Sequence, residues 1–284
     1  MKHYLALLRP AQWIKNGFVL APLIFSRSFL DGGAVVRALA AFAVFCAASS
    51  AGYVINDLVD RERDRQHPLK RTQRPIAAGH VSPRGATLVV ALLLPLALIA
   101  AWLLSLQFLA AVATYLAVSI AYSVRLKDLP IVDLFAIAVG FVLRVWGGAV
   151  ALPVALSVWM FITALSLALY LAATKRRQEL LSSGTAVDFR AVLQHYTVRL
   201  MDYYSEIAAV ATFVFYSLYI ANVRPQLALT IPVVLFGLFR YRYLMELDSG
   251  GHVSPTDALL RDPQLIACAV VWTAVSVVVL FETS

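Results

Sequence analysis

Charged residues are scarce in this sequence, and their scarcity excludes a soluble globular protein. Only 14% of the 284 residues are charged, whereas 61% are hydrophobic and the mean hydropathy is +0.78. Soluble domains carry about 25% charged residues. The sequence also lacks a P-loop, a dinucleotide-binding glycine fingerprint and a Cys/His nucleophile pair. The composition therefore indicates a multi-span membrane protein.

Cysteine is nearly absent, and the histidines are scattered. Cys46 and Cys268 lie inside apolar stretches, so we expect packing residues and neither a disulfide nor a metal site. The histidines show no metal-ligand spacing, so surface positions are expected for all five: His3, His67, His80, His195 and His252. The net charge of +8 follows from membrane topology or attracts anionic headgroups, and no nucleic-acid partner is expected.

Long apolar stretches dominate the chain and predict its architecture. Eight are of bilayer length, at about 38–56, 86–104, 108–124, 131–152, 155–174, 203–221, 227–245 and 264–281. A shorter one, at about 17–30, is interrupted by Arg27. These stretches predict an all-α helical bundle of about nine transmembrane helices, forming one domain over residues 1–284. No cleavable signal peptide is expected.

Basic residues are distributed unevenly between the predicted loops. With the N-terminus in the cytoplasm, the outer loops keep only Arg27, Arg37 and Arg224, and the remaining basic loop residues lie inside. Lys and Arg favour cytoplasmic loops. The sequence therefore predicts a multi-pass protein of the cell (inner) membrane whose polar loops, and any active site, face the cytoplasm.

The stretch 56–64, which reads Asn-Asp-Leu-Val-Asp-Arg-Glu-Arg-Asp, follows the first long apolar run directly. If the helix continues, Asp57, Asp60 and Asp64 share one face, with Asn56 at its edge. Three carboxylates on one face repel each other, and a divalent cation relieves that repulsion. Mg²⁺ is commonly held by one or two carboxylates together with substrate phosphate oxygens. The pattern predicts a magnesium site formed by the three aspartates.

A structural alternative exists for the same stretch. Solvated helix ends often carry acids that pair with neighbouring bases. The bases available for such pairs are Arg61, Arg63 and Arg65.

Cations gather in four of the predicted cytoplasmic segments. They are Lys15; Lys70, Arg71 and Arg74; Arg125 and Lys127; and Lys175 and Arg176. So many cations on one side of the membrane suit a substrate pair that carries several phosphates. Arg144 is different, because it lies well inside a span, where structural capping and substrate contact both explain a charge. The small residues after it, Gly147, Gly148 and Ala149, allow close helix packing.

The Asn56–Asp64 motif at the end of a second span resembles the first aspartate motif of the UbiA superfamily of intramembrane transferases. That family usually carries a second motif, Y-A-x-x-D-x-x-x-D, after the sixth span. Here the segment 175–180 reads Lys-Arg-Arg-Gln-Glu-Leu. This segment resembles the K-R-x-x-E-L of the branch formed by decaprenyl-phosphate phosphoribosyltransferases. Similar segments occur at 9–16, 67–79, Tyr196-Thr197, Arg240-Tyr241, and among Asp257, Leu260, Arg261 and Asp262.

The resemblance implies a reaction and a set of site residues. The implied donor is phosphoribosyl pyrophosphate, the acceptor a polyprenyl phosphate in the membrane, and the cofactor Mg²⁺. Pyrophosphate release, a lipid-linked phosphoribose for cell-wall arabinan, and a possible homo-oligomer are also implied. We expect catalytic roles for Asp57, Asp60, Asp64 and Glu179. We expect substrate binding by Lys15, Asn16, Asn56, Lys70, Arg71, Arg74, Tyr122, Arg125, Lys127, Lys175 and Arg176.

Two other functions fit parts of the sequence. The first is transfer of a prenyl group from a prenyl diphosphate to an aromatic acceptor, which needs fewer cations than this chain carries. The second is a non-enzymatic lipid transporter. Transporters usually carry broken helices near the midplane, whereas these spans are largely apolar apart from Arg144.

Overall fold

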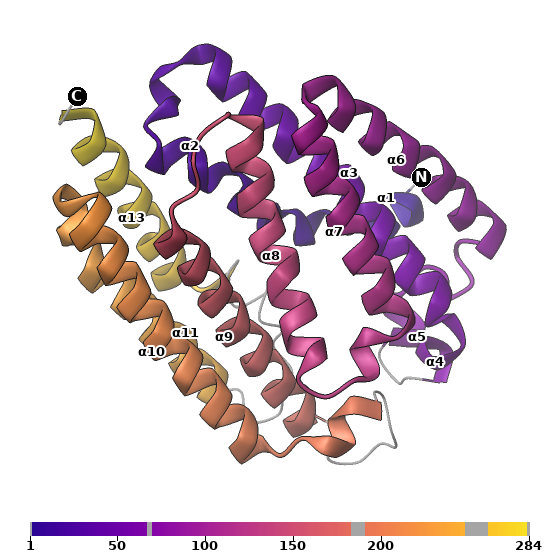
Figure 1. Ribbon diagram of the computed structural model, residues 1–284. Coiled ribbons are helices and arrows are strands. Elements are labelled where there is room, and N and C mark those ends of the chain that lie inside the picture. The colour runs from indigo at the N-terminus through magenta and orange to yellow at the C-terminus, as the bar shows by residue number, and fades with distance from the viewer. Residues whose placement is uncertain (1, 67–69, 183–190, 248–260, 283–284) are drawn as a thin grey trace. The chain divides into compact units, whose positions relative to one another are not determined.

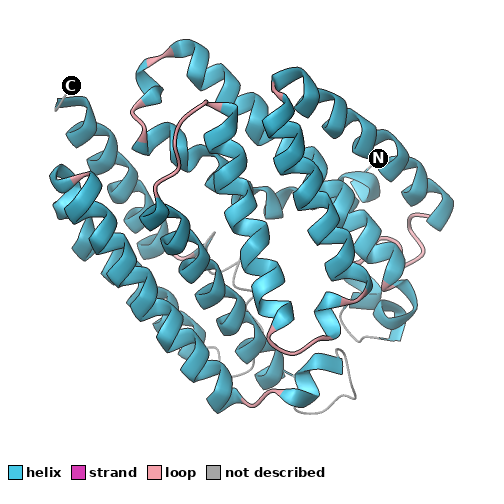
Figure 2. Ribbon diagram, viewed as in Figure 1, coloured by secondary structure: helices cyan, strands magenta, loops and turns pink. Residues whose placement is uncertain are grey.

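A computed structural model describes residues 2–66, 70–182, 191–247 and 261–282. It divides into two compact units, Met1–Ala155 and Leu156–Ser284. Within the described residues the regular structure is helical throughout, without a strand (Figure 2). The predicted all-α class is thus confirmed, and the single transferase domain over residues 1–284 stays a prediction. Some residues singled out in the sequence lie outside the described ranges: His67, Pro68, His252, Asp257 and Leu260.

The helices follow the chain in order (Figure 1). The first unit contains α1 (Lys2–Leu8), η1 (Pro10–Leu20), α2 (Ala21–Phe25), η2 (Ser28–Leu30), α3 (Gly32–Val59), α4 (Arg61–Gln66), α5 (Lys70–Gln73), α6 (Pro83–Leu104), α7 (Leu106–Val124), η3 (Leu126–Asp128) and α8 (Val132–Ala151). The second unit contains α9 (Val158–Ser182), η4 (Ala191–His195), α10 (Val198–Val223), η5 (Pro225–Leu229), α11 (Thr230–Leu247) and α13 (Pro263–Glu282).

Eight of these helical stretches are long and apolar enough to cross a membrane. They coincide with the eight predicted spans of bilayer length. The shorter stretch predicted at 17–30 is also helical, but η1, α2 and η2 divide it, so it is not among these eight long helices. Pro22 cannot donate a backbone hydrogen bond, and Arg27 adopts a left-handed conformation with φ 65°. Both features interrupt a continuous α-helix.

The divided segment nevertheless lies along α3 in the opposite direction. Arg9 pairs with Asp57 at the carboxyl end of α3. Trp13 Nε1 donates to Ser50 Oγ at 3.0 Å, and Ser50 lies earlier in α3 than Asp57. Further on, Leu20 and Leu23 pack against two alanines near the start of α3, Ala34 and Ala38. The order of these contacts makes residues 9–23 an antiparallel neighbour of α3.

Helix α8 allows η1 to approach closely. A methyl group at Gly148 would lie 2.0 Å from the carbonyl oxygen of Val19, and one at Gly147 would lie 2.5 Å from the ring of Phe45. Close approach through small residues is a common device of membrane helices. The prediction that Gly147 and Gly148 permit close packing is therefore confirmed. The same contact fixes the polar residues of η1 beside α3 and α8.

Candidate active site

The aspartate array lies where α3 ends and α4 begins. Asp60 interrupts the regular helix, yet its N–H donates to the Asn56 carbonyl at 2.9 Å, and the Asp64 N–H donates to the Asp60 carbonyl at 2.8 Å. Helical hydrogen bonding therefore bridges the break. Asp57 and Asp64 are buried, and Asp60 and Asn56 are half-buried. The predicted continuation of the helix through the array is confirmed apart from the kink at Asp60.

Asp57 meets two arginines that are distant in the sequence. Arg9 Nη2 and Arg74 Nη1 both donate to Asp57 Oδ1. The other carboxylate oxygen, Oδ2, is buried and has no hydrogen-bond partner. A buried carboxylate oxygen without a partner is costly. Asp57 thus has one oxygen neutralised by cations and one available for a further cation or donor.

The other two aspartates pair with lysines. Lys127 Nζ donates to Asp60 Oδ1, and the lysine side chain is only 4% exposed. Lys70 Nζ lies 3.7 Å from Asp64 Oδ1. Together with Arg9 and Arg74, these lysines place four cations from three separate segments around the array. The structure therefore brings Lys70, Arg74 and Lys127, three of the predicted substrate-binding residues, to the aspartates.

The residues of the array are chemically suited to Mg²⁺. Carboxylate oxygens are hard ligands, and the unpartnered Oδ2 of Asp57 offers one directly. Among the residues that the structure describes, no three acidic, histidine or cysteine side chains converge closely enough to hold one ion. Each aspartate faces a base instead. Ligation of Mg²⁺ by Asp57, Asp60 and Asp64 stays a prediction, and it requires a shared ion to displace some of these bases.

The local bases pair elsewhere. Arg61 Nε donates to Glu62 Oε1 at 2.9 Å, and Arg65 Nη1 lies 3.2 Å from both oxygens of the same glutamate. Arg63 lies 3.9 Å from Asp128. The structural alternative predicted that these three arginines neutralise the aspartates, but in the structure they pair with Glu62 and Asp128 instead.

Two predicted cations lie apart from the array. Arg71 and Arg125 are exposed, and within the described ranges neither makes an ion pair. Tyr122 is half-buried and lies near Lys15. Substrate binding by Arg71, Arg125 and Tyr122 stays a prediction.

A second polar group of unit 1 lies further back along α3, around Asn16. The amide Nδ2 donates to Ser49 Oγ at 3.1 Å and to Cys46 Sγ at 3.3 Å, and Oδ1 accepts from Arg144 Nε at 2.8 Å. Asn16 thus connects η1 to α3 and to α8. The intramembrane Arg144 is only 5% exposed, and its contact with Asn16 explains how a charge is held inside a span.

Lys15 carries a charge in this enclosed region. Burial, together with the positive charges of Arg144 and Arg9, lowers the pKa of the Lys15 ammonium to about 8. Tyr122 has a smaller effect and raises the pKa of Lys15. A nearby anion would stabilise the charged ammonium and raise the pKa of Lys15 again.

Unit 2 carries the basic segment that follows the predicted sixth span. Arg176 is fully buried and donates from Nη1 to Glu179 Oε2 at 2.6 Å. Lys175 Nζ lies 3.8 Å from Glu179 Oε1, and its side chain is 41% exposed. Glu179 therefore neutralises part of the charge of both predicted substrate-binding cations, and Lys175 remains accessible to solvent.

A neighbouring network in unit 2 holds this segment. Arg177 Nε donates to Asp202 Oδ1 and Nη2 to Glu246 Oε2, both at 2.7 Å. Arg242 Nη2 donates to the same Asp202 oxygen at 2.7 Å. Gln178 Nε2 adds a bond to the Met245 carbonyl at 2.5 Å. The network joins the end of α9 to α10 and α11.

Sequence reasoning missed several of these residues as parts of the site. Arg9 stands in the Arg-Pro start of the 9–16 segment, so the motif itself was a usable signal. Asp202 and Glu246 had no such signal, because ion pairs between different helices leave no spacing pattern in the sequence.

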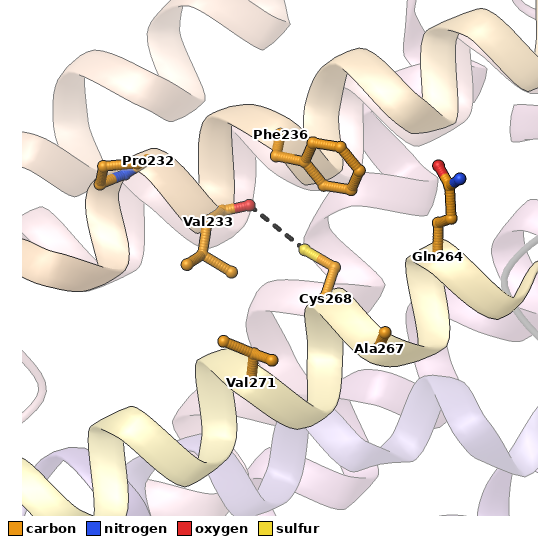
Figure 3. A pocket seen from close by; sticks show the side chains of 7 residues that line it. All are labelled: Pro232, Val233, Phe236, Gln264, Ala267, Cys268 and Val271. Carbon is orange, nitrogen blue, oxygen red and sulfur yellow. Dashed lines mark hydrogen bonds between the residues drawn. The ribbon is translucent and has the colours of Figure 1, made fainter.

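An apolar groove lies between α11 and α13 (Figure 3). Its volume is about 410 Å³, and its lining includes Val233, Phe236 and Val271. Cys268 Sγ donates to the Val233 carbonyl at 3.2 Å (Figure 3). The groove contains no cluster of charged groups, and Cys268 packs there as the sequence predicts.

Comparisons with known proteins cover both units. The family model described as the UbiA prenyltransferase family matches residues 19–260. Proteins named decaprenyl-phosphate phosphoribosyltransferase from Mycolicibacterium smegmatis and Mycobacterium tuberculosis are each 33% identical to the chain. The matches cover 93% and 94% of this chain and 88% and 90% of those proteins, respectively.

The fold has a solved counterpart. A UbiA homolog from Archaeoglobus fulgidus, solved with GPP and Mg²⁺ bound, superposes with a TM-score of 0.72. The match covers 98% of this chain and 99% of that one at 22% identity, so it supports the fold alone. The family match and the curated relatives confirm the resemblance noted in the sequence. The chain is a membrane-spanning transferase that belongs to the UbiA prenyltransferase family.

Proposed function

We propose that the protein transfers 5-phosphoribose from phosphoribosyl pyrophosphate to a polyprenyl phosphate, such as decaprenyl phosphate, and releases pyrophosphate. The reaction is Mg²⁺-dependent, and its product is a lipid-linked phosphoribose for cell-wall arabinan. The names of the relatives that match nearly the whole chain support this assignment. A site facing the cytoplasm and a homo-oligomeric assembly belong to the same proposal.

The observation that carries the proposal is the ring of cations around the aspartate array. Four cations from three segments, Arg9, Lys70 with Arg74, and Lys127, face three carboxylates. Such an arrangement suits a diphosphate, because its oxygens can accept from the bases while a metal joins it to the acids. Prenyl transfer to an aromatic acceptor also uses one diphosphate, so the further cations Lys15, Lys175 and Arg176 favour a substrate pair with more phosphates.

The residues of the chain account for the steps of this reaction. Asp57, Asp60 and Asp64 would hold Mg²⁺, which supplies neutralisation of the charge that develops on the leaving diphosphate. Arg9 and Arg74 can turn from Asp57 towards phosphate oxygens, since arginine binds phosphate with two parallel hydrogen bonds. The bond between ribose C1 and the diphosphate oxygen breaks, and C1 passes through an oxocarbenium-like state.

The acceptor needs no strong base. A phosphate oxygen of the lipid forms the new bond to C1, and it is already ionised near pH 7. Positioning therefore matters more than proton removal. Within unit 2 we assign phosphate contact to Lys175 and Arg176. Glu179 would orient both cations through its contacts at 3.8 and 2.6 Å.

A substrate exchange tests the proposed function. Purified full-length protein with Mg²⁺ is given either phosphoribosyl pyrophosphate plus decaprenyl phosphate, or geranyl diphosphate plus 4-hydroxybenzoate. We expect pyrophosphate release and a lipid-linked phosphoribose with the first pair only. Turnover with the second pair and none with the first would reject the proposal in favour of aromatic prenyl transfer.

Glu179→Gln is expected to reduce turnover with the first pair while the protein still folds.

A further inference from the structure

The buried Arg144 of α8 has only neutral partners. Its guanidinium donates to Asn16 Oδ1 at 2.8 Å, to the Gly140 carbonyl at 2.7 Å and to the Tyr115 hydroxyl at 2.9 Å. Across the described part of the chain, no carboxylate pairs with it. Buried charges in membrane segments usually pair with an opposite charge or with backbone carbonyls. The guanidinium of Arg144 is thus hydrogen-bonded and lies over the rings of Tyr115 and Phe141, but no negative charge accompanies it in the described part of the chain.

Lys15 adds a second cation beside it. The lysine precedes Asn16 directly, and Arg144 and Arg9 are near enough for their charges to act on its ammonium. Arg9 already pairs with Asp57. In the described ranges Lys15 itself makes neither a hydrogen bond nor an ion pair. Two like charges thus share a half-buried region that offers them no acid.

This region is separated from the aspartate array along α3. Asn16 is bonded to Ser49, which precedes Asp57 by eight residues. At 1.5 Å per residue the separation along the helix axis is about 12 Å. A single diphosphate bound at Asp57 therefore does not reach the Asn16–Arg144 contact, although Arg9, which pairs with Asp57, also acts on Lys15. An anion that compensates Arg144 together with Lys15 is consequently a different phosphate group from the leaving diphosphate.

We propose that Lys15 binds a phosphate monoester, and that Asn16 and Arg144 are positioning residues that hold η1 and supply a second positive charge. The inference rests on the proposed function, whose substrates carry two such groups. One is the 5-phosphate of the sugar donor, and the other is the phosphate of the lipid acceptor. A monoester near pH 7 carries a charge of nearly −2, which matches the two cations.

Equilibrium binding tests the proposal without turnover. Phosphoribosyl pyrophosphate with Mg²⁺, and decaprenyl phosphate in detergent micelles, are each titrated alone into the full-length protein. Lys15→Met should weaken binding of one compound about tenfold or more, the size expected for a lost charge-assisted hydrogen bond, and leave the other unchanged. Lys15→Arg should retain most of the affinity. Lys2→Met, which removes an exposed lysine of α1, is the matched control.

The compound that loses affinity identifies the source of the phosphate. Weaker binding of the donor assigns Lys15 to the sugar 5-phosphate, and weaker binding of the lipid assigns it to the acceptor headgroup. Equal binding of both compounds by wild type and Lys15→Met overturns the inference. If the wild-type protein binds neither compound, the proposed function fails. In that case inorganic phosphate is titrated instead into the wild type and Lys15→Met. Equal phosphate binding by the two proteins overturns the inference about Lys15, independently of the proposed function.

Variants of the positioning residues separate charge from structure. Asn16→Asp keeps an acceptor for Arg144 but supplies an internal anion, so it should weaken binding of the same compound that Lys15→Met affects. Arg144→Gln removes charge, whereas Arg144→Lys retains it. We expect the lysine variant to bind the phosphate compound more tightly than the glutamine variant at similar thermal stability. Identical affinities in these two folded variants would remove Arg144 from the proposal.

Discussion

Asp57 illustrates at the scale of single residues how the array combines acids and bases. Two arginines share its Oδ1, and Oδ2 is left buried and unpartnered. A site intended only for ion pairing would distribute the arginines over both oxygens, since bidentate pairing is the stronger arrangement. This arrangement suits a carboxylate that binds a metal ion through Oδ2 while Oδ1 stays paired with phosphate-binding arginines. The neighbouring Asp60, paired with Lys127, is the simplest position for testing this interpretation.

Asp60→Asn should reduce turnover by about 100-fold or more, because a metal contributes several kcal/mol to stabilisation of the transition state. The isosteric amide keeps the shape of the side chain but not its charge. Asp128→Asn is the control, because Asp128 lies in the same unit and faces Arg63. A second readout is the shift in unfolding temperature on adding Mg²⁺ with pyrophosphate, which should shrink in Asp60→Asn. Full activity and an unchanged shift would exclude Asp60 from the metal site.

The Lys15 ammonium should give phosphate binding a pH dependence. With its pKa lowered to about 8, Lys15 is charged below that pH and neutral above it. A phosphate monoester becomes a dianion above about pH 6. Affinity for the compound that Lys15 contacts should therefore be highest near pH 7 and decline above about pH 8. The charged and titratable groups that act on Lys15 are Arg9, Tyr122 of α7 and Arg144 of α8.

Titrations of the binding constant between pH 6.5 and 9.5 check this dependence. Lys15→Arg should remove the decline, because guanidinium stays charged throughout this range. Tyr122→Phe should leave the decline in place. The same decline in Lys15→Arg as in the wild type would assign it to another group.

At the scale of elements, the contact between η1 and α8 holds the polar residues of η1 in place. The Val19 carbonyl lies against Gly148, where no side chain fits. Three positions earlier along η1, Asn16 bonds to both α3 and α8. Displacing η1 from α8 would therefore disturb the Asn16–Arg144 contact together with the packing.

Gly148→Ala should lower the free energy of unfolding by about 1–3 kcal/mol, the usual cost of overpacking. Its methyl group would lie 2.0 Å from a backbone oxygen, which cannot rotate away as a side chain can. Gly17→Ala is the matched control in η1, because a methyl group there meets nothing within 4 Å. Thermal unfolding in detergent measures both. Equal stability of the two variants would contradict the close approach of η1 to α8.

The network at the end of α9 makes a separate prediction for unit 2. Asp202 accepts from both Arg177 and Arg242, and Arg177 is buried. In Asp202→Asn, Glu246 is the one carboxylate within the described residues that still pairs with Arg177 and Arg242. We expect a loss of about 1–3 kcal/mol of stability, typical of a disrupted charged hydrogen bond. Glu206→Gln, an exposed position one turn further along α10, should change stability little. Equal unfolding temperatures in the two variants would show that the network contributes nothing.

The predictability of the fold differs between elements for physical reasons. The eight long helices follow from apolar runs of bilayer length, because length and composition alone determine whether a helix can span. The 17–30 segment is equally apolar, but Pro22 and the left-handed Arg27 prevent a continuous helix. Pro22 and Arg27 are visible in the sequence, but apolar length alone does not show how they divide the segment. A prediction based on hydropathy therefore identified the segment as a span but assigned the wrong local structure.

The candidate site was predictable in its acids and only partly in its bases. The aspartates follow from spacing on one helix, which is local information. Their partners come from segments far apart in the sequence, as the pairing of Asp57 with Arg9 and Arg74 shows. Local rules instead favour neighbours such as Arg61 and Arg65, which turn to Glu62. Tertiary structure decided the partners, and the sequence provides no spacing pattern for that choice.

At the scale of the whole molecule, the remaining question is how the chain threads the membrane. Residues 9–23 lie antiparallel to α3, from Asp57 at one end to Ala34 at the other. Although they form no long α-helix, this path is as long as a span. We therefore expect residues 17–30 to cross the membrane, with Lys2, Lys15 and Arg71 on the cytoplasmic side and Arg27 on the outer side, in agreement with the distribution of basic residues.

Cysteine labelling in intact cells tests this threading. Single cysteines replace Lys2, Arg27 or Arg71 in a background where Cys46→Ser and Cys268→Ser remove the native thiols. A membrane-impermeant maleimide should label only the cysteine at position 27, and permeabilised cells should allow labelling at all three. Labelling of the position 2 cysteine in intact cells would mean that residues 17–30 do not cross. The Asn16–Arg144 contact would then have to form without a membrane-spanning η1 segment. Labelling of position 71 as well would reverse the predicted orientation and place the aspartate array on the outer side.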